Sequence, residues 1–181
     1  MFQIDLTPGD VNSIEATPAL TTQLTGISPK TLKKAADAGF IPDMSIATVL
    51  DVGRLPMIES VRTPTGVPVP FVRMGVQAPD SGYGPGHLPA RPFLGVGAAM
   101  SDDEFLASVV RWWKRTGQSR VLAAHYLLVG IGGLTVGLVG GIDDTLTDGD
   151  RIEYIGEHLR LIARADDVLT RRVRLIDTVG A

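Results

Sequence analysis

Residues 25–42 read TGISPKTLKKAADAGFIP, a stretch in which turn-forming residues and lysines follow one another at helical spacing. Ser28 followed by Pro29 is typical of a helix start, because the serine hydroxyl caps a free N–H and proline lacks one. Gly39 favours a left-handed cap at the other end, and Pro42 prevents the helix from restarting. The stretch therefore predicts a short helix between Ser28 and Gly39.

A second short helix is predicted just before it, within TPALTTQLTG at residues 17–26. Thr17 and Pro18 repeat the pairing of a capping hydroxyl with proline, and Gly26 ends the segment. Two short helices joined by a turn of Gly26 and Ile27 are typical of a helix-turn-helix.

The lysines of the second helix suggest a use for this unit. Lys30, Lys33 and Lys34 lie toward one side of the predicted helix, and Leu32 lies toward the other. The N-terminal half of such a helix enters the major groove of DNA, where lysines and backbone N–H groups meet phosphates. The spacing therefore predicts a DNA-binding face.

The same residues resemble part of a known protein family. The stretch LTGISPKTLKKAADAGFIP resembles the N-terminal DNA-binding unit of MerR-type regulators and the related excisionase-like winged helices. The match lies in Thr25-Gly26-x-Ser28-x-x-Thr31-Leu32 and, six residues later, in Gly39-Phe40-Ile41-Pro42. The resemblance covers about residues 17–42, and it includes neither the arginine-bearing wing nor the long dimerisation helix of MerR regulators.

The resemblance implies roles for individual residues. The DNA face would consist of Ser28, Lys30, Thr31, Lys33 and Lys34. The core of the unit would consist of Leu20, Leu24, Ile27, Leu32 and Phe40.

The next segment, 63–92, holds seven of the twelve prolines and five glycines, so we expect no helix there. Its part 67–76 predicts an edge-type strand, because proline is tolerated at a sheet edge. We therefore expect a helix-turn-helix domain at 1–62, a strand and linker at 63–92, and an α+β domain at 93–181. The last would dimerise or bind a partner.

A further helix is predicted at 101–116, where Ser101 and Glu104 have the spacing of a capping box. Basic residues near its end match the negative pole of the helix and are also candidates for secondary phosphate contacts. They are Arg111, Lys114, Arg115 and Arg120. Of Trp112 and Trp113, we expect one ring in the core and the other at an interface, although both could be core.

The apolar run 121–142 has the length of a membrane span, but glycines crowd it, and Gly132-Gly133 divides it into two strand-length halves. We expect two buried strands, 126–131 and 134–142, followed by a polar turn at 143–150. Further strands are expected at 151–161 and 173–179, with a helical turn at 165–172. The predicted class is α+β: a helical unit followed by a small, mainly antiparallel sheet packed with one or two helices.

Composition narrows the functional classes. The chain of 181 residues has no cysteine, which excludes disulfides and thiol chemistry and favours a reducing cytoplasm. The start of the sequence has no secretory-signal pattern. The net charge of −3 argues against a protein coated in nucleic acid but leaves room for a local basic face. No catalytic motif, metal-ligand spacing or cofactor loop is recognisable, so no enzyme, metal or cofactor is predicted.

Two functions are argued from these residues, and an enzyme acting in the glycine-rich C-terminal half stays open as a third alternative. The first is a cytoplasmic, sequence-specific DNA-binding protein, which would be a transcription regulator or a recombination accessory factor and would bind double-stranded DNA as a homodimer. The second is a phage or bacterial interaction or assembly component whose helix pair docks on protein. The lysine-bearing helix is central to both, because its surroundings decide what can approach it.

Overall fold

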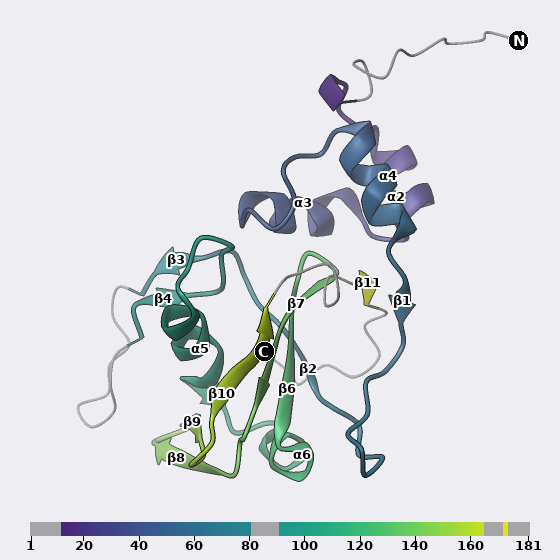
Figure 1. Ribbon diagram of the computed structural model, residues 1–181. Helices are drawn as coiled ribbons and strands as arrows, with labels where there is room; N and C mark the ends of the chain where they lie inside the picture. Colours follow the sequence, from purple (N-terminus) through teal and green to yellow (C-terminus); the bar gives the residue numbers. More distant parts are fainter. Residues whose placement is uncertain (1–11, 81–90, 165–171, 174–181) are drawn as a thin grey trace, which may run out of the picture.

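A computed structural model of the chain describes residues 12–80, 91–164 and 172–173. Over these residues the fold is a mixed α+β arrangement with five helices and several sheets, as the sequence predicts at the level of class. Figure 1 shows three of the helices gathered at one end of the central strands.

These three helices are α2 (Pro18–Thr25), α3 (Pro29–Asp37) and α4 (Ile46–Arg54). Each begins after a hydroxyl side chain that accepts a hydrogen bond from the N–H three residues later, and these caps are Thr17, Ser28 and Ser45. α2 ends at Gly26, whose φ of 70° is left-handed. The predicted limits of α2 and α3 are confirmed, because they depend on local capping chemistry.

The three helices share a buried cluster. Ile27 and Leu32 are buried, as expected, whereas Leu20, Leu24 and Phe40 are half-buried around them. Leu134, which belongs to a strand far along the chain, is fully buried in the same cluster. The helices are therefore packed onto the sheet by apolar contact.

The central sheet is built around β6 (Tyr126–Ile131) and β7 (Leu134–Gly140), an antiparallel pair joined by Gly132 and Gly133. Both glycines have positive φ, which suits them to a tight two-residue turn. The prediction of two buried strands in the apolar run is confirmed. Among the described residues, no helix combines the length and apolar character needed to cross a membrane.

Shorter strands extend this sheet on both sides. β2 (Phe71–Arg73) pairs in parallel with β6 at one edge, which confirms the edge strand predicted within 67–76. β10 (Arg160–Arg164) and β11 (Arg172–Val173) both pair antiparallel with β7. β1 (Met57–Ile58) pairs in parallel with β11. The sheet is thus mixed, with two parallel pairs.

Two smaller sheets correct the sequence predictions. β8 (Asp144–Asp148), β9 (Arg151–Ile155) and β5 (Trp113–Lys114) form a three-stranded antiparallel sheet. The predicted turn at 143–150 is therefore mostly strand, and the predicted strand 151–161 is divided between β9 and β10. β3 (Ala78–Pro79) pairs with β4 (Phe93–Leu94). The helical turn predicted at 165–172 and the strand at 173–179 lie outside the described residues, apart from β11.

The helix predicted at 101–116 is shorter than expected. α5 (Asp102–Val110) begins with the predicted capping box of Ser101 and Glu104 but ends at Val110. Arg111 is extended, Trp112 follows with a φ of 67°, and the chain continues as β5. α6 (Gln118–Ala124) was not predicted, because it begins after Gly117 without a side-chain cap.

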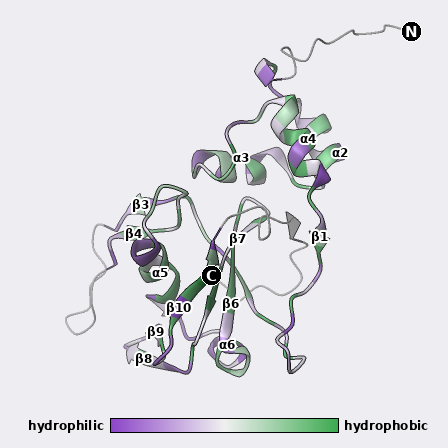
Figure 2. Cartoon of the chain, in the orientation of Figure 1, coloured by the Kyte–Doolittle hydropathy of each residue, from purple (hydrophilic) through white to green (hydrophobic). Residues whose placement is uncertain are grey.

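The main core lies where α5 meets the central sheet. Phe105 of α5 is fully buried, and a Cβ added to Gly137 of β7 would come within 2.8 Å of its ring. The guanidinium of Arg164 lies 4.9 Å from the centre of the same ring. Arg164 also donates to the carbonyl oxygens of Gly97, Ala98 and Met100. Figure 2 shows hydrophobic residues concentrated on the central strands.

The buried Tyr154 makes the stability of the fold depend on pH in the alkaline range. It is 1% exposed, and burial raises the pKa of its phenol to about 12 from 10.0. The folded state therefore holds this proton more tightly, and we expect the free energy of unfolding to fall by about 1.4 kcal/mol per pH unit as the pH rises from 10 to 12. Denaturant titrations across this range should show the loss in the natural chain and not in Tyr154→Phe. An equal loss in both proteins would contradict the assignment.

Candidate nucleic-acid interface

The helix α3 has one exposed and one buried side. Leu32 and Ala35 are fully buried, whereas Lys30, Lys33 and Lys34 are exposed. Positions three and four residues apart lie on the same face of a helix, so the three lysines form one surface, which we call the lysine face. The predicted exposure of these side chains is what the structure shows.

The opposite side of α3 rests on the β6–β7 turn. A Cβ added to Gly132 would lie 2.7 Å from both the backbone nitrogen and the Cβ of Ala35. A Cβ added to Gly133 would lie 2.8 Å from the side chain of Ile27. The backbone N–H of Ala98 also donates to the carbonyl of Ala38, just after α3, at 2.8 Å. α3 is thus held between α2 and α4 on one side and the sheet on the other (Figure 1).

The two remaining residues of the predicted DNA face lie at the start of α3. The Ser28 hydroxyl accepts from the backbone N–H of Thr31 at 3.2 Å and donates to the Thr31 hydroxyl at 2.8 Å. Ser28 is exposed, but Thr31 is half-buried, and its carbonyl faces Gly132. Four of the five predicted residues are therefore accessible, and Thr31 belongs to the boundary with the sheet.

The positive charge of the lysine face does not extend over the rest of the helical unit. Lys33 forms an ion pair with Asp37, one turn further along α3, while Lys30 and Lys34 form no ion pair with any described residue. The described residues 12–62 contain five basic and five acidic side chains. The basic ones are Lys30, Lys33, Lys34, Arg54 and Arg62, and the acidic ones are Glu15, Asp37, Asp43, Asp51 and Glu59. With Asp5 and Asp10 of the sequence counted, the unit 1–62 has five basic and seven acidic side chains, so its positive side-chain charge is concentrated on the lysine face.

The second basic stretch does not join this face. Arg111 forms an ion pair with Glu153 at 2.8 Å, and Arg115 donates to the carbonyl of Gly149. Lys114 and Arg120 are exposed on β5 and α6. α6 leads into one end of β6 and α3 lies at the other, so roughly 20 Å of a six-residue strand separates them. These residues therefore lie apart from the lysine face, and their role as secondary phosphate contacts stays a prediction.

The tryptophan pair also differs from expectation. Trp112 is 3% exposed and cannot form an interface in this conformation. Trp113 is half-buried against the main core, and its indole N–H donates to the carbonyl of Val109. The expectation of one core ring is confirmed for Trp112, whereas an interface role for Trp113 stays a prediction.

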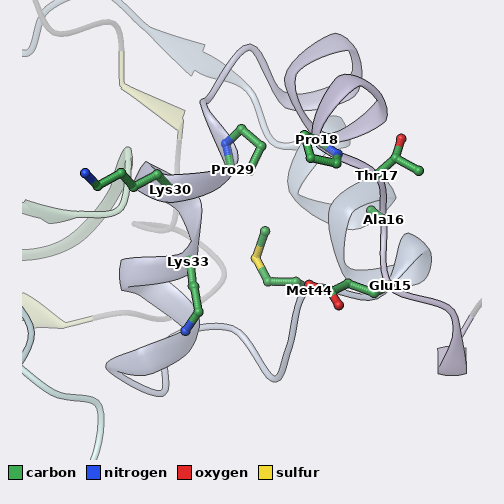
Figure 3. Close-up of a pocket in the computed structure, with 8 residues that line it drawn as sticks. All are labelled: Glu15, Ala16, Thr17, Pro18, Pro29, Lys30, Lys33 and Met44. Atoms are coloured by element: carbon green, nitrogen blue, oxygen red, sulfur yellow. The ribbon is translucent and has the colours of Figure 1, made fainter.

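A groove of about 420 Å³ opens beside the lysine face. It lies between α3 and the segment that leads into α2, and Figure 3 shows the Met44 side chain directed into it. Its lining consists of Glu15, Ala16, Thr17, Pro18, Pro29, Lys30, Lys33 and Met44. Sequence reasoning missed this groove. The two prolines were recognised only as helix starts, and Met44 carried no signal of its own.

No protein-family model, curated protein or solved structure matches this chain. The described residues also contain no group of three or more histidine, aspartate or glutamate side chains placed to hold a metal ion.

Proposed function

We propose that this protein binds double-stranded DNA through the lysine face of α3, with α2 and α3 acting as a MerR-like or excisionase-like helix-turn-helix. The observation that carries the proposal is the contrast along α3. Three lysines of one surface are exposed, while Leu32 and Ala35 directly opposite are fully buried. A helix fixed on one side and cationic on the other has the form required to enter a major groove.

The start of α3 adds to this argument. Ser28 is exposed at the positive end of the helix dipole, and Lys30 follows two residues later. Phosphate oxygens are favoured at such an end, because backbone N–H groups and the dipole both attract negative charge. The lysines would then determine the affinity for DNA, and the capped first turn of α3 would fix the position of the helix along the major groove.

The number of lysines limits what one chain can do alone. Three phosphate contacts correspond to a slope of about −3 in a plot of log affinity against log salt concentration. Such a protein binds weakly as a monomer, so we propose that it acts as a homodimer. A two-fold arrangement would place two copies of α3 about 34 Å apart, which is one turn of DNA. Regulation of transcription and assistance in recombination are both compatible with this mode.

The matched experiment compares two double variants in a mobility-shift titration on genomic fragments at several salt concentrations. Lys30→Gln/Lys34→Gln removes the two α3 lysines that form no ion pair within the described part of the chain. Arg54→Gln/Arg73→Gln removes the same charge from exposed positions outside the lysine face. We expect the first to weaken binding roughly 30-fold at low salt and to reduce the slope by about 2, because each lysine accounts for about one released counterion. The second should change affinity less than about threefold.

An equal effect of the two variants would mean that the lysine face is not where DNA binds. Absence of salt-sensitive retention in the natural chain would remove the DNA proposal altogether. The helix pair would then be assigned to docking on protein, as in an assembly component. Asp37 within the lysine face and Glu15 at its border are the observations that favour that second function.

A further inference from the structure

The groove beside α3 has the dimensions and lining of a small-molecule site. Its volume of about 420 Å³ falls within the usual range for ligand pockets. Apolar side chains of Ala16, Pro18, Pro29 and Met44 form most of its lining, with two lysines and one glutamate among them. From this we infer that the groove binds a small organic anion, consisting of an apolar body and one acidic group.

The walls of the groove are formed before any ligand arrives. The backbone N–H of Ala16 donates to the carbonyl of Met44 at 2.9 Å, and that of Ile46 donates to the carbonyl of Ile14 at 2.9 Å. These bonds hold one wall to the start of α4. Pro18 and Pro29 are the first residues of α2 and α3, where their rings are fixed by the helices. Little conformational freedom would therefore be lost when a ligand binds.

The charges around the groove favour an anion over a cation. Among the lining residues, Lys30 and Lys33 carry two positive charges and Glu15 carries one negative charge, while Asp37 pairs with Lys33 from outside the lining. The first residues of α2 and α3 both line the groove, so the positive ends of two helix dipoles lie beside it. Lys33 is paired with Asp37, and an incoming acid would compete for its ammonium group.

The position of the groove couples it to the lysine face. Lys30 and Lys33 belong to both, so a bound anion would neutralise charges that phosphates would otherwise meet. Binding of the anion and binding of DNA should therefore oppose each other, by the same factor in both directions. This coupling, unlike the groove itself, rests on the proposed function.

The test uses two fluorescent probes with the same aromatic body. One is 8-anilinonaphthalene-1-sulfonate, which carries an acidic group, and the other is N-phenyl-1-naphthylamine, which is neutral. Titrations without DNA on the folded natural chain should show saturable binding of the sulfonate probe. Lys30→Gln/Lys33→Gln should weaken that binding about tenfold and leave the neutral probe unchanged, because two exposed ion pairs contribute roughly 1.4 kcal/mol together.

Two further variants separate the groove from the helix in general. Met44→Trp should abolish saturable binding of both probes, because the larger ring fills the space into which Met44 points (Figure 3). Lys34→Gln removes an α3 lysine that does not line the groove and should change sulfonate binding less than about twofold. Unfolding temperatures measured in parallel confirm that each variant is folded.

The outcomes distinguish the two proposals. Two results would overturn the groove site whether or not the protein binds DNA. One is sulfonate binding that does not change in Met44→Trp, and the other is an equal loss of sulfonate binding in Lys34→Gln and in Lys30→Gln/Lys33→Gln. Specific binding in the groove supports the site even if the mobility-shift titration finds no DNA binding. Where DNA does bind, unchanged DNA affinity at saturating sulfonate probe would overturn the coupling.

Discussion

Alanine in place of Gly132 is expected to lower the free energy of unfolding by about 3 kcal/mol or more. Gly132 has a φ of 62°, a conformation that costs an alanine roughly 1–2 kcal/mol. The added methyl group would also lie 2.7 Å from the backbone nitrogen of Ala35, and overpacking of this kind costs about 1–3 kcal/mol more. Because the contact is with the backbone of α3, the helix itself would have to move.

Gly149→Ala provides the matched control in the same denaturant titration. Gly149 also has a positive φ, at 57°, but no atom lies within 4 Å of the position its Cβ would take. Its substitution should cost only the conformational part, about 1–2 kcal/mol. If the two variants lose the same stability, the turn does not press against α3, and the helical unit rests on the sheet by other contacts.

The second large effect is expected from Arg111→Met. The side chain of Glu153 is 8% exposed and forms an ion pair with Arg111 at 2.8 Å. Without the arginine, a buried carboxylate would lose its compensating charge, and we expect a loss of about 3–5 kcal/mol in the free energy of unfolding. Urea denaturation of the variant and the natural chain measures this difference directly.

A double variant distinguishes the contribution of the ion pair to stability from the other contacts of Arg111 and Glu153. Arg111→Met/Glu153→Leu replaces both charges by apolar groups, and its stability should return to within about 1 kcal/mol of the natural chain. A loss in the double variant as large as in Arg111→Met would show that Arg111 stabilises the fold through other contacts. A phosphate-binding role for Arg111, in contrast, would predict little change in stability from either variant.

The helices at the N-terminal end were predictable because their limits are set locally. Thr17 and Ser28 cap the N–H groups of residues three positions later, and Gly26 takes the left-handed conformation that ends α2. Each of these interactions spans four residues or fewer, so the sequence pattern contains all that is needed. The same holds for the turn of Gly132 and Gly133 between β6 and β7.

The region after Val110 could not be predicted because its conformation depends on distant partners. Residues 111–116 have the composition of a helix end, yet Trp113 pairs with Ile152 in a sheet, and Arg111 is drawn to Glu153. These contacts span about forty residues. The polar stretch 143–150 is misread for a different reason: it is the first strand of a local hairpin with β9, and its polar composition resembles a turn.

The candidate site was predictable in part. The exposure of Lys30, Lys33 and Lys34 follows from helical periodicity around Leu32, which needs no tertiary information. The half-buried position of Thr31 does not follow from it, because the covering residue, Gly132, is about a hundred positions away. The groove likewise requires Met44 and the segment before α2 to come together across two helices.

The contact between α3 and the β6–β7 turn also has a consequence for synthesis on the ribosome. Roughly 80 residues separate the end of α4 from this turn, so at about 5–20 residues per second the helices emerge some 4–16 s before it. During that interval Leu134, which completes their buried cluster, has not yet emerged. The nascent chain therefore presents an apolar surface on α3 to chaperones until its own hairpin arrives to cover it.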